Sequence, residues 1–319
     1  MKAYLIALTL LLTGCAQIGT YSPNKGGLEV AINSDIELSR QSDKTPLKIR
    51  AVYPVAEGRY PLIVLSHGTF SNNQRYDLVA KYWASNGYMV LIPEHIDANY
   101  AVMPKSVADM VNIIGTRVED MSQILDELEL IKNQAPALKN KIIKNKIIAA
   151  GHSVGSLVAM RVTGLKIYEI NTKKTISNDE NRFDVLVMLN DPGKQRSMPI
   201  SAWYGSTVPT FMSTGTDDYG LMGSREEPKE ANQILSANKS VDRYQLLLQK
   251  GDHYFGGLVQ KEVKAEPDYE GLELFNENST AFMDAYIKGN KNALRYLQNI
   301  DMQAETNLRA ELIREFAQN

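Results

Sequence analysis

The sequence is poor in cysteine and histidine, and neither sign of charge is in excess. A single cysteine among 319 residues excludes a disulfide framework and any zinc or iron–sulfur site built from several cysteines. With 35 basic and 37 acidic residues, the net charge of −2 predicts no nucleic-acid partner. Hydrophobic residues make up 44% and charged residues 23%, which is the balance of a globular protein and not of a disordered one. Because there are only four histidines, the position of each is informative.

Apolar runs long enough to cross a membrane are also absent. The run Tyr4–Leu12 is shorter than the about 20 residues that a membrane-spanning helix needs. Lys2 precedes this run, so residues 1–14 are typical of a signal peptide. Residues 15–45 include a stretch rich in Gly, Ser, Asn and Pro, which predicts a flexible tether. Residues 46–319 are then expected to form a single domain.

The cysteine lies directly after the predicted signal peptide. The segment Leu12-Thr13-Gly14-Cys15 resembles the lipobox of bacterial lipoproteins, which implies cleavage before Cys15 and a diacylglycerol on its sulfur. Acyl chains on this residue would hold the protein on a membrane surface of the cell envelope. Ala16 follows in place of Asp, which implies the outer membrane if the cell is Gram-negative. An ordinary secretory signal followed by a chance cysteine is the alternative interpretation.

Segments with a strand pattern alternate with segments with a helix pattern from Leu47 onward. Strands are predicted at Leu47–Tyr53, Pro61–Ser66, Tyr88–Ile92, Lys146–Ala150, Asp184–Leu189, Val208–Ser213 and Arg243–Gln249, and helices at Tyr76–Ser85, Val107–Asn133, Val154–Val162, Glu227–Ala237, Thr280–Gln298 and from Ala304. This alternation predicts an α/β fold with a mostly parallel central sheet and helices on both faces. Such sheets carry their sites at the carboxyl ends of the strands.

The clearest motif is Gly151-His152-Ser153-Val154-Gly155, a G-x-S-x-G sequence between a predicted strand and a predicted helix. A serine on so sharp a turn has strained backbone geometry, and side chains two positions before and after it would collide with the chain. The turn projects the Ser153 hydroxyl above the sheet and places the N–H of Val154 beside a reacting carbonyl group. Ser153 is therefore the candidate nucleophile. A tight turn with a capping serine is the structural alternative.

Five segments in this order carry a family resemblance. They are Pro61–Gly68, Ala84–Tyr88, Pro93–Asp97, Gly151–Gly155 and Gly251–Gly257. The chain resembles the α/β-hydrolases, and more narrowly the bacterial dienelactone-hydrolase-like and platelet-activating-factor-acetylhydrolase-like serine esterases, with cutinases as more distant relatives. The resemblance covers roughly Pro46 to Leu297 and implies the α/β-hydrolase fold. It also implies a serine hydrolase that works through a Ser-His-Asp triad.

The order of the triad in this fold is serine, then acid, then histidine. His253 is the histidine that follows Ser153, so it is the predicted general base. Three aspartates compete for the role of the acid. Asp218 matches the turn after the penultimate strand of many α/β-hydrolases, its neighbour Asp217 would serve if that turn is wound differently, and Asp191 matches the position used by the acetylhydrolase relatives.

A second oxyanion-hole donor is expected in the loop after strand Pro61–Ser66. The match to the family selects the N–H of Thr69, with Phe70 next, to act with Val154. His67 and His152 are expected to be structural residues. Glu94, His95 and Asp97 are expected to hydrogen-bond beneath the site and not to bind a metal, because no further histidine has the spacing to complete a zinc site. Arg117 and Asp120 on the long helix are expected to form an ion pair.

The expected activity is hydrolysis of carboxylic esters through an acyl-enzyme, without nucleotide, flavin or metal cofactor. Phe70, Trp203 and Tyr219 are candidate pocket residues on loops at the site. Because no long apolar stretch predicts a lipase-type lid, small or short-acyl esters are favoured over lipid-like ones. Two alternatives remain at this point. One is a catalytically silent envelope lipoprotein that binds a ligand or partner, and the other is a lipase, polyester depolymerase or peptidase that uses the same triad.

Overall fold

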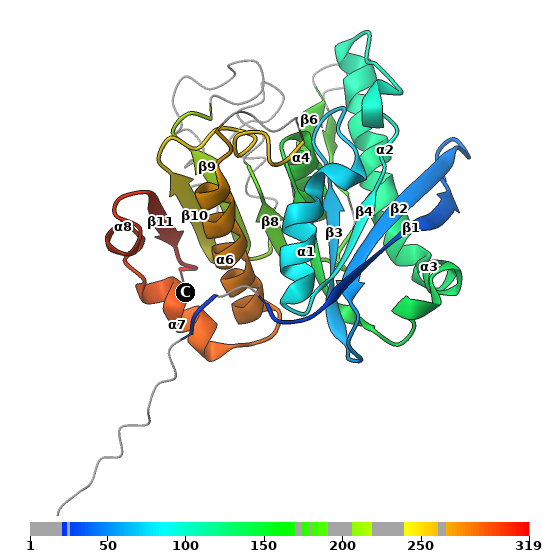
Figure 1. The fold of residues 1–319 in the computed structure, drawn as a ribbon. Helices are drawn as coiled ribbons and strands as arrows, with labels where there is room; N and C mark the ends of the chain where they lie inside the picture. The colour runs from blue at the N-terminus through cyan, green and yellow to red at the C-terminus, as the bar shows by residue number, and fades with distance from the viewer. Residues whose placement is uncertain are drawn as a thin grey trace, which may run out of the picture.

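A computed structural model describes residues 21–23, 26–169, 174–178, 180–190, 206–218, 239–260 and 266–318. In these ranges the main sheet has nine strands in the order β1-β2-β4-β3-β5-β8-β9-β10-β11 (Figure 1). A separate two-stranded ladder joins β6 to β7. The chain therefore builds one wide sheet, and the predicted site lies where its parallel strands end.

The elements of the described ranges have the following bounds. The strands are β1 Val30–Ser39, β2 Pro46–Pro54, β3 Tyr60–Ser66, β4 Met89–Pro93, β5 Ile142–Gly151, β6 Ile167–Glu169, β7 Lys174–Ile176, β8 Val185–Met188, β9 Thr210–Gly215, β10 Arg243–Leu248 and β11 Ala310–Glu315. The helices are α1 Asp77–Ser85, α2 Val107–Asp126, α3 Leu128–Gln134, α4 Val154–Val162, α6 Tyr269–Tyr286, α7 Lys291–Asn299 and α8 Met302–Glu305.

The centre of the sheet is parallel. Strands β4, β3, β5, β8, β9 and β10 pair in parallel, whereas β2 is antiparallel to both β1 and β4 and β11 is antiparallel to β10. Each parallel pair needs a connection that crosses the sheet, and the helices supply most of these connections. The mostly parallel sheet that the sequence predicts is confirmed.

Helices cover both faces of the sheet, as predicted (Figure 1). Along β3, Leu62 and Val64 pack with α2, α3 and α4 on one face, and Ile63 and Leu65 pack with α1 and α6 on the other. All four side chains are fully buried. A strand that is apolar on both sides is typical of the interior of such a sheet. The two cores hold the carboxyl ends of β3 and β5 in fixed positions.

Three of the helices predicted from the sequence differ from the elements found in the structure. The helix predicted over Val107–Asn133 breaks at Glu127, where the backbone leaves helical geometry and α3 begins. The predicted helix Thr280–Gln298 is two helices, α6 and α7, separated by a turn with Gly289 at a φ of +71°. The helix predicted from Ala304 gives way to β11, because Ala310 and Leu312 alternate inward and the segment completes the edge of the sheet beside β10.

The predicted tether over residues 15–45 is also wrong in part, because it contains β1. Ile36 and Leu38 on this strand are buried in the core, and the strand pairs with β2 along its length. The Gly-rich and Asn-rich composition before the strand obscured its alternating apolar positions. The predicted signal peptide, residues 1–14, and Cys15 lie outside the described residues. In the described part of the chain, no helix is both long enough and apolar enough to cross a bilayer.

Candidate active site

Ser153 lies on a sharp turn between β5 and α4. Its backbone has φ +56° and ψ −124°, a conformation that costs a non-glycine residue about 1–3 kcal/mol. The flanking glycines are required by contact. A Cβ atom on Gly151 would overlap the carbonyl oxygen of Gly155, and one on Gly155 would overlap the carbonyl oxygen of Ser66. The collisions that the motif implies are therefore present, and the strained turn is held by the surrounding backbone.

His253 and Asp218 come together at the ends of neighbouring strands. His253 follows β10 and Asp218 follows β9, and their Nδ1 and Oδ1 atoms lie 3.0 Å apart. The other carboxylate oxygen of Asp218 accepts a hydrogen bond of 2.7 Å from Asn190 Nδ2, at the end of β8. Because Nδ1 of His253 donates to the carboxylate, its Nε2 carries the lone pair. This Nε2 is buried and has no hydrogen-bond partner among the described residues.

The two alternative acids are placed differently. The Asp217 side chain is exposed, and in the described ranges its carboxylate accepts a hydrogen bond from Thr216 Oγ1 at 3.5 Å. It makes no contact with His253 there. Asp191 lies outside the described residues, although Asn190 beside it reaches Asp218. Of the acids whose positions are described, Asp218 is the one that faces the imidazole.

His152 links three loops around the turn. Its Nε2–H donates to the carbonyl oxygen of His253 at 2.8 Å. Its Nδ1 has no proton, because the proton of the neutral ring is on Nε2, so Nδ1 accepts the hydroxyl proton of Tyr76 at 3.0 Å, and that hydroxyl oxygen accepts the N–H of Gly68 at 2.8 Å. Burial, assisted by nearby His253, lowers the pKa of His152 to about 3, so this imidazole stays neutral. The serine turn, the His253 loop and the loop after β3 therefore form one connected unit.

Two backbone amides near the turn are unengaged. The N–H groups of Thr69 and Val154 make no hydrogen bond within the described parts of the chain. The N–H of Phe70 donates to Asp97 Oδ2 at 3.2 Å, so Phe70 is not available as the second donor. The half-buried Phe70 ring stacks on Tyr100 with 5.0 Å between ring centroids. Trp203 and Tyr219, the other candidate pocket residues, lie outside the described residues.

An ion pair lies behind the loop after β3. Arg117 on α2 contacts both carboxylate oxygens of Asp97, at 2.8 and 2.7 Å. Its Nη1 also donates to the carbonyl oxygen of His67 at 2.6 Å, and its Nη2 to that of Gly68 at 3.3 Å. The ion pair predicted between Arg117 and Asp120 is therefore wrong, because the two side chains leave the helix toward different partners. Asp120 pairs instead with Arg40 on the β1–β2 connection, at 2.8 Å.

His95 lies between Asp120 and the end of β3. Its Nδ1 is 2.9 Å from Asp120 Oδ2, and its Nε2 accepts from the Ser66 hydroxyl at 2.9 Å. Its backbone N–H donates to Nε2 of His67, so His67 carries its proton on Nδ1. Burial, reinforced by Arg117, lowers the pKa of both imidazoles well below the usual value. Both histidines therefore act here as neutral hydrogen-bonding groups.

The fold agrees with the comparisons with known proteins. The chlorophyllase family model matches residues 20–177, just under half of the chain. This match contains the loop after β3 and the Ser153 turn.

The chain has the α/β-hydrolase fold.

Two curated proteins show how distant the similarity is. Chlorophyllase type 0 of Chenopodium album is 32% identical over 71 residues, which are 22% of this chain and 20% of that protein. Chlorophyllase-2 of Arabidopsis thaliana is 26% identical over 136 residues, 42% of this chain and 39% of that protein. The chain thus matches about two fifths or less of the length of these relatives. The similarity supports a hydrolase that acts on esters. It does not extend to the predicted dienelactone-hydrolase-like or acetylhydrolase-like character.

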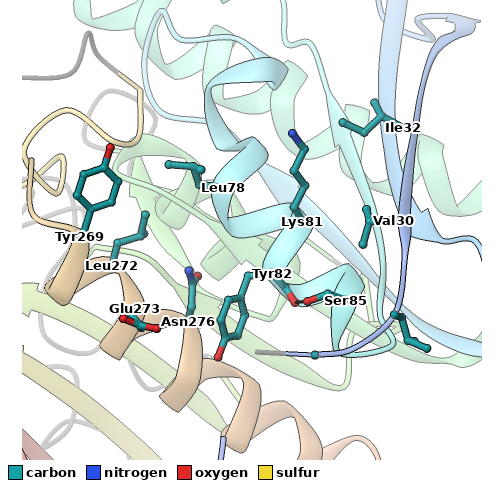
Figure 2. A pocket seen from close by; sticks show the side chains of 12 residues that line it. Val30, Ile32, Leu78, Lys81, Tyr82, Ser85, Tyr269, Leu272, Glu273 and Asn276 are labelled. Carbon is teal, nitrogen blue, oxygen red and sulfur yellow. Dashed lines mark hydrogen bonds between the residues drawn. The ribbon is translucent and has the colours of Figure 1, made fainter. Parts of the chain in front are cut away.

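An apolar groove of about 870 Å³ lies elsewhere on this α/β-hydrolase (Figure 2). Val30 and Ile32 of β1, Leu78 and Tyr82 of α1, and Leu272 of α6 line it. Neither Ser153 nor His253 is among the lining residues. A large cavity is usually the first candidate for an active site, but this one contains no nucleophile with a base beside it. The chemistry of the site therefore points to the strand ends and not to the groove.

Proposed function

We propose that this α/β-hydrolase cleaves carboxylic esters with Ser153 as nucleophile, His253 as general base and Asp218 as the acid that orients the base. One observation carries the proposal. At the strand ends, His253 has its Nδ1 against a buried carboxylate while its Nε2 is without a partner in the described ranges. His152 hydrogen-bonds to the carbonyl oxygen of His253, and the backbone of the next residue, Ser153, has the strained turn of a nucleophilic serine. An imidazole in this state accepts a proton from a hydroxyl group.

The reaction then follows from the geometry. As the Ser153 oxygen attacks the ester carbonyl carbon, its proton passes to His253 Nε2. The carbonyl oxygen becomes an oxyanion, and the unengaged N–H groups of Thr69 and Val154 are the donors that would stabilise it. His253 returns the proton to the leaving alcohol, so an acyl group remains on Ser153. Water, deprotonated by His253 in turn, releases the acid and restores the serine.

Small or short-acyl esters are the proposed substrates. The basis is the sequence, which contains no long apolar stretch of the lipase-lid type. Phe70 follows Thr69 directly and stacks on exposed Tyr100, so an aromatic surface lies beside the proposed oxyanion hole. The names of the plant relatives make chlorophyll a second substrate to include in any assay. A lipase, a polyester depolymerase and a peptidase would use the same triad and differ in the substrate that they turn over.

The test combines labelling and turnover on the full-length chain in detergent. A fluorophosphonate probe should form one adduct, mapped by peptide mass to Ser153, and Ser153→Ala should form none. A panel of p-nitrophenyl esters from acetate to palmitate, a peptide substrate, a polyester film and chlorophyll identifies the bond that is cleaved. Falling turnover with longer acyl chains supports the short-acyl proposal. If the folded wild-type protein gives neither adduct nor turnover, the result would favour the alternative in which the protein binds a ligand or partner and is catalytically silent.

We also propose that the protein is anchored to the bacterial cell envelope through a lipid on Cys15. The support is the segment Leu12-Thr13-Gly14-Cys15 after the apolar run. In a bacterial host, labelled palmitate should be incorporated into the wild-type chain and not into Cys15→Ser. The wild-type chain should also sediment with the outer membrane. Equal labelling of both chains, or a wild-type chain released into the soluble fraction, would contradict the anchor.

A further inference from the structure

We infer that Arg117 is a positioning residue that orients the Thr69 N–H toward the oxyanion. The inference rests on the proposed ester hydrolysis, since it assigns a role in the same site. Arg117 lies on α2, far from Ser153 in the sequence, and its side chain is fully buried. It touches no reacting atom and acts through the backbone of the loop after β3.

The backbone on both sides of Thr69 is held from the Arg117 side. Arg117 donates to the carbonyl oxygens of His67 at 2.6 Å and of Gly68 at 3.3 Å. Asp97, which Arg117 holds through both carboxylate oxygens, accepts the N–H of Phe70 at 3.2 Å. One ion pair thus engages two carbonyl groups before Thr69 and one amide after it. The Thr69 N–H between them is left without a partner in the described ranges.

Because a peptide group is planar, fixing its carbonyl oxygen also fixes the direction in which its N–H points. The carbonyl group of Gly68 and the N–H of Thr69 belong to one peptide unit, and in a trans peptide they point to opposite sides. The described ranges contain no cis peptide bond. The Gly68 oxygen is held by Arg117 Nη2 and also accepts from Nδ1 of His67 at 2.8 Å. Fixing that oxygen on the Arg117 side therefore fixes the Thr69 N–H on the opposite side.

The backbone of Phe70, which follows Thr69, shows that the loop needs these contacts to keep its conformation. Phe70 has a φ of +58°, a left-handed conformation that is unfavourable for a bulky side chain. A conformation of this kind persists only where the surroundings impose it. The bond from the Phe70 N–H to Asp97 supplies that constraint, and Arg117 in turn fixes Asp97. Without the guanidinium, Asp97 would lose its partner, and the Gly68 oxygen would keep only the bonds from His67 Nδ1 and from the Ser71 N–H, at 2.8 and 3.2 Å.

The charges of the pair are maintained at working pH. Burial opposes the charge of Asp97, but the guanidinium of Arg117 and its hydrogen bonds lower the pKa of this carboxyl to about 2. His67, which shares the Gly68 oxygen with Arg117, is neutral. The group behind the loop is therefore a neutral pair that is already oriented before the oxyanion forms. Preorganised donors of this kind need no rearrangement during the reaction.

The experiment compares Arg117→Lys and Arg117→Met with the full-length wild-type chain on p-nitrophenyl acetate. Arg50→Met is the matched control, because Arg50 makes a two-pronged contact with Asp77, at 2.7 and 2.8 Å, without touching the loop. Loss of an oxyanion donor costs about 10²–10³-fold in kcat, so Arg117→Met should lower kcat by about 10²-fold with KM within about threefold. Arg117→Lys keeps the charge, cannot reach both carbonyl groups, and should give an intermediate kcat.

A second readout separates positioning from folding. Inhibition by a trifluoromethyl ketone, which forms the oxyanion on Ser153, should weaken by the same factor as kcat in each Arg117 variant. The Arg50→Met protein should keep the wild-type kcat and inhibitor affinity, even if its melting temperature falls as far as that of the Arg117 variants. Added guanidinium ion should restore part of the activity of Arg117→Ala and leave Arg50→Ala unchanged. A merely structural role would produce neither the parallel loss nor the rescue.

The outcomes distinguish the two proposals. An active wild-type chain whose Arg117→Met variant keeps kcat and inhibitor affinity within about threefold overturns the positioning role alone. The same conclusion follows if activity falls only in proportion to the folded fraction. If Arg117→Met does not fold, Arg117→Lys and Asp97→Asn give the decisive comparison. A wild-type chain that forms no adduct and turns over no ester overturns the proposed function and the positioning role together.

Discussion

Ser66 Oγ lies 2.9 Å from His95 Nε2, and His95 Nδ1 lies 2.9 Å from Asp120. These three residues repeat the contacts of a catalytic triad next to the proposed one. All three side chains are fully buried, and Ser66 belongs to the regular strand β3 instead of a strained turn. Distances alone therefore do not identify the nucleophile in this fold. Two features distinguish the arrangements: the backbone conformation of Ser153, and the Nε2 of His253, which has no partner in the part of the chain that the structure describes.

Ser66→Ala and Ser153→Ala test this distinction directly. We expect Ser153→Ala to abolish the fluorophosphonate adduct and ester turnover while the melting temperature stays near the wild-type value. Ser66→Ala should keep the adduct and lose about 1–3 kcal/mol of unfolding free energy, because it leaves His95 Nε2 buried without a partner. Labelling followed by a urea titration measures both. The assignment of Ser153 fails if the adduct persists in Ser153→Ala.

The acid of the proposed triad is tested by Asp218→Asn, with its exposed neighbour Asp217→Asn as the control. In Asp218→Asn, the amide no longer stabilises the imidazolium ion and favours the wrong tautomer of His253. A drop in kcat of about 10⁴-fold is expected, as in other serine hydrolases. Asp217→Asn should keep kcat within about twofold, because its carboxylate does not contact His253. If Asp217→Asn lowers kcat and Asp218→Asn does not, Asp217 and not Asp218 is the acid of the triad.

The glycines of the serine turn give a third prediction. A Cβ on Gly155 would overlap the backbone of Ser66, which no side-chain rotation can relieve, so Gly155→Ala should lose the probe adduct and most of its stability. The control is Gly115→Ala on α2, where a Cβ meets no atom within 4 Å. An alanine inside a helix stabilises by about 0.5–1 kcal/mol relative to glycine, so this variant should melt slightly higher. Thermal unfolding and labelling compare the two variants.

Buried neutral histidines make the fold sensitive to acid. The pKa values of His67, His95 and His152 are lowered by burial, so the unfolded chain binds more protons as pH falls below about 6.5. Their contribution to stability is present above that pH and is lost below it, by about 1.4 kcal/mol per pH unit for each. Burial raises the pKa of Asp120 to about 6 and that of Glu277 to about 7, so these two carboxyl groups add stability at low pH that is lost as pH rises. Three histidines outweigh two carboxyl groups, so acid should destabilise the fold.

Urea titrations at about pH 7.5 and about pH 5.5 measure this balance. The midpoint should be lower at the acidic pH. Asp120→Asn removes one of the two opposing contributions, so its midpoint should fall more steeply between the same two values. A wild-type midpoint that is unchanged or higher in acid would mean that the three histidines are protonated in the folded protein.

The serine turn could be predicted from the sequence because its cause is local. Gly151 and Gly155 clear space for backbone atoms of the same short segment and its neighbouring strand, and α4 begins and ends where its pattern predicts. The parallel order of the central strands could be predicted for a similar reason, since alternating strands and helices leave few other arrangements. These inferences depend on residues that are close together in the chain.

The supporting contacts could not be predicted, because they join distant segments. Tyr76 reaches His152, and Arg117 reaches Asp97, across different elements of the fold. In both cases the sequence contains an ordinary polar residue on a helix, with no spacing that identifies its partner. The contact between Asn190 and Asp218 could not be predicted from the sequence either. The edge strands β1 and β11 were hidden for a related reason, since pairing with a neighbour and not local propensity decides such segments.

The order of the site residues along the chain determines when reactivity can arise during synthesis. Ser153 and the N–H groups of Thr69 and Val154 are synthesised before Asp218 and His253, which follow β9 and β10. These two strands pair with each other in register, and β10 is synthesised late. Until β10 has been added beside β9, Ser153 would lack its proposed base. On the proposed mechanism, the growing polypeptide is therefore inert toward esters until β10 has been synthesised and has paired with β9.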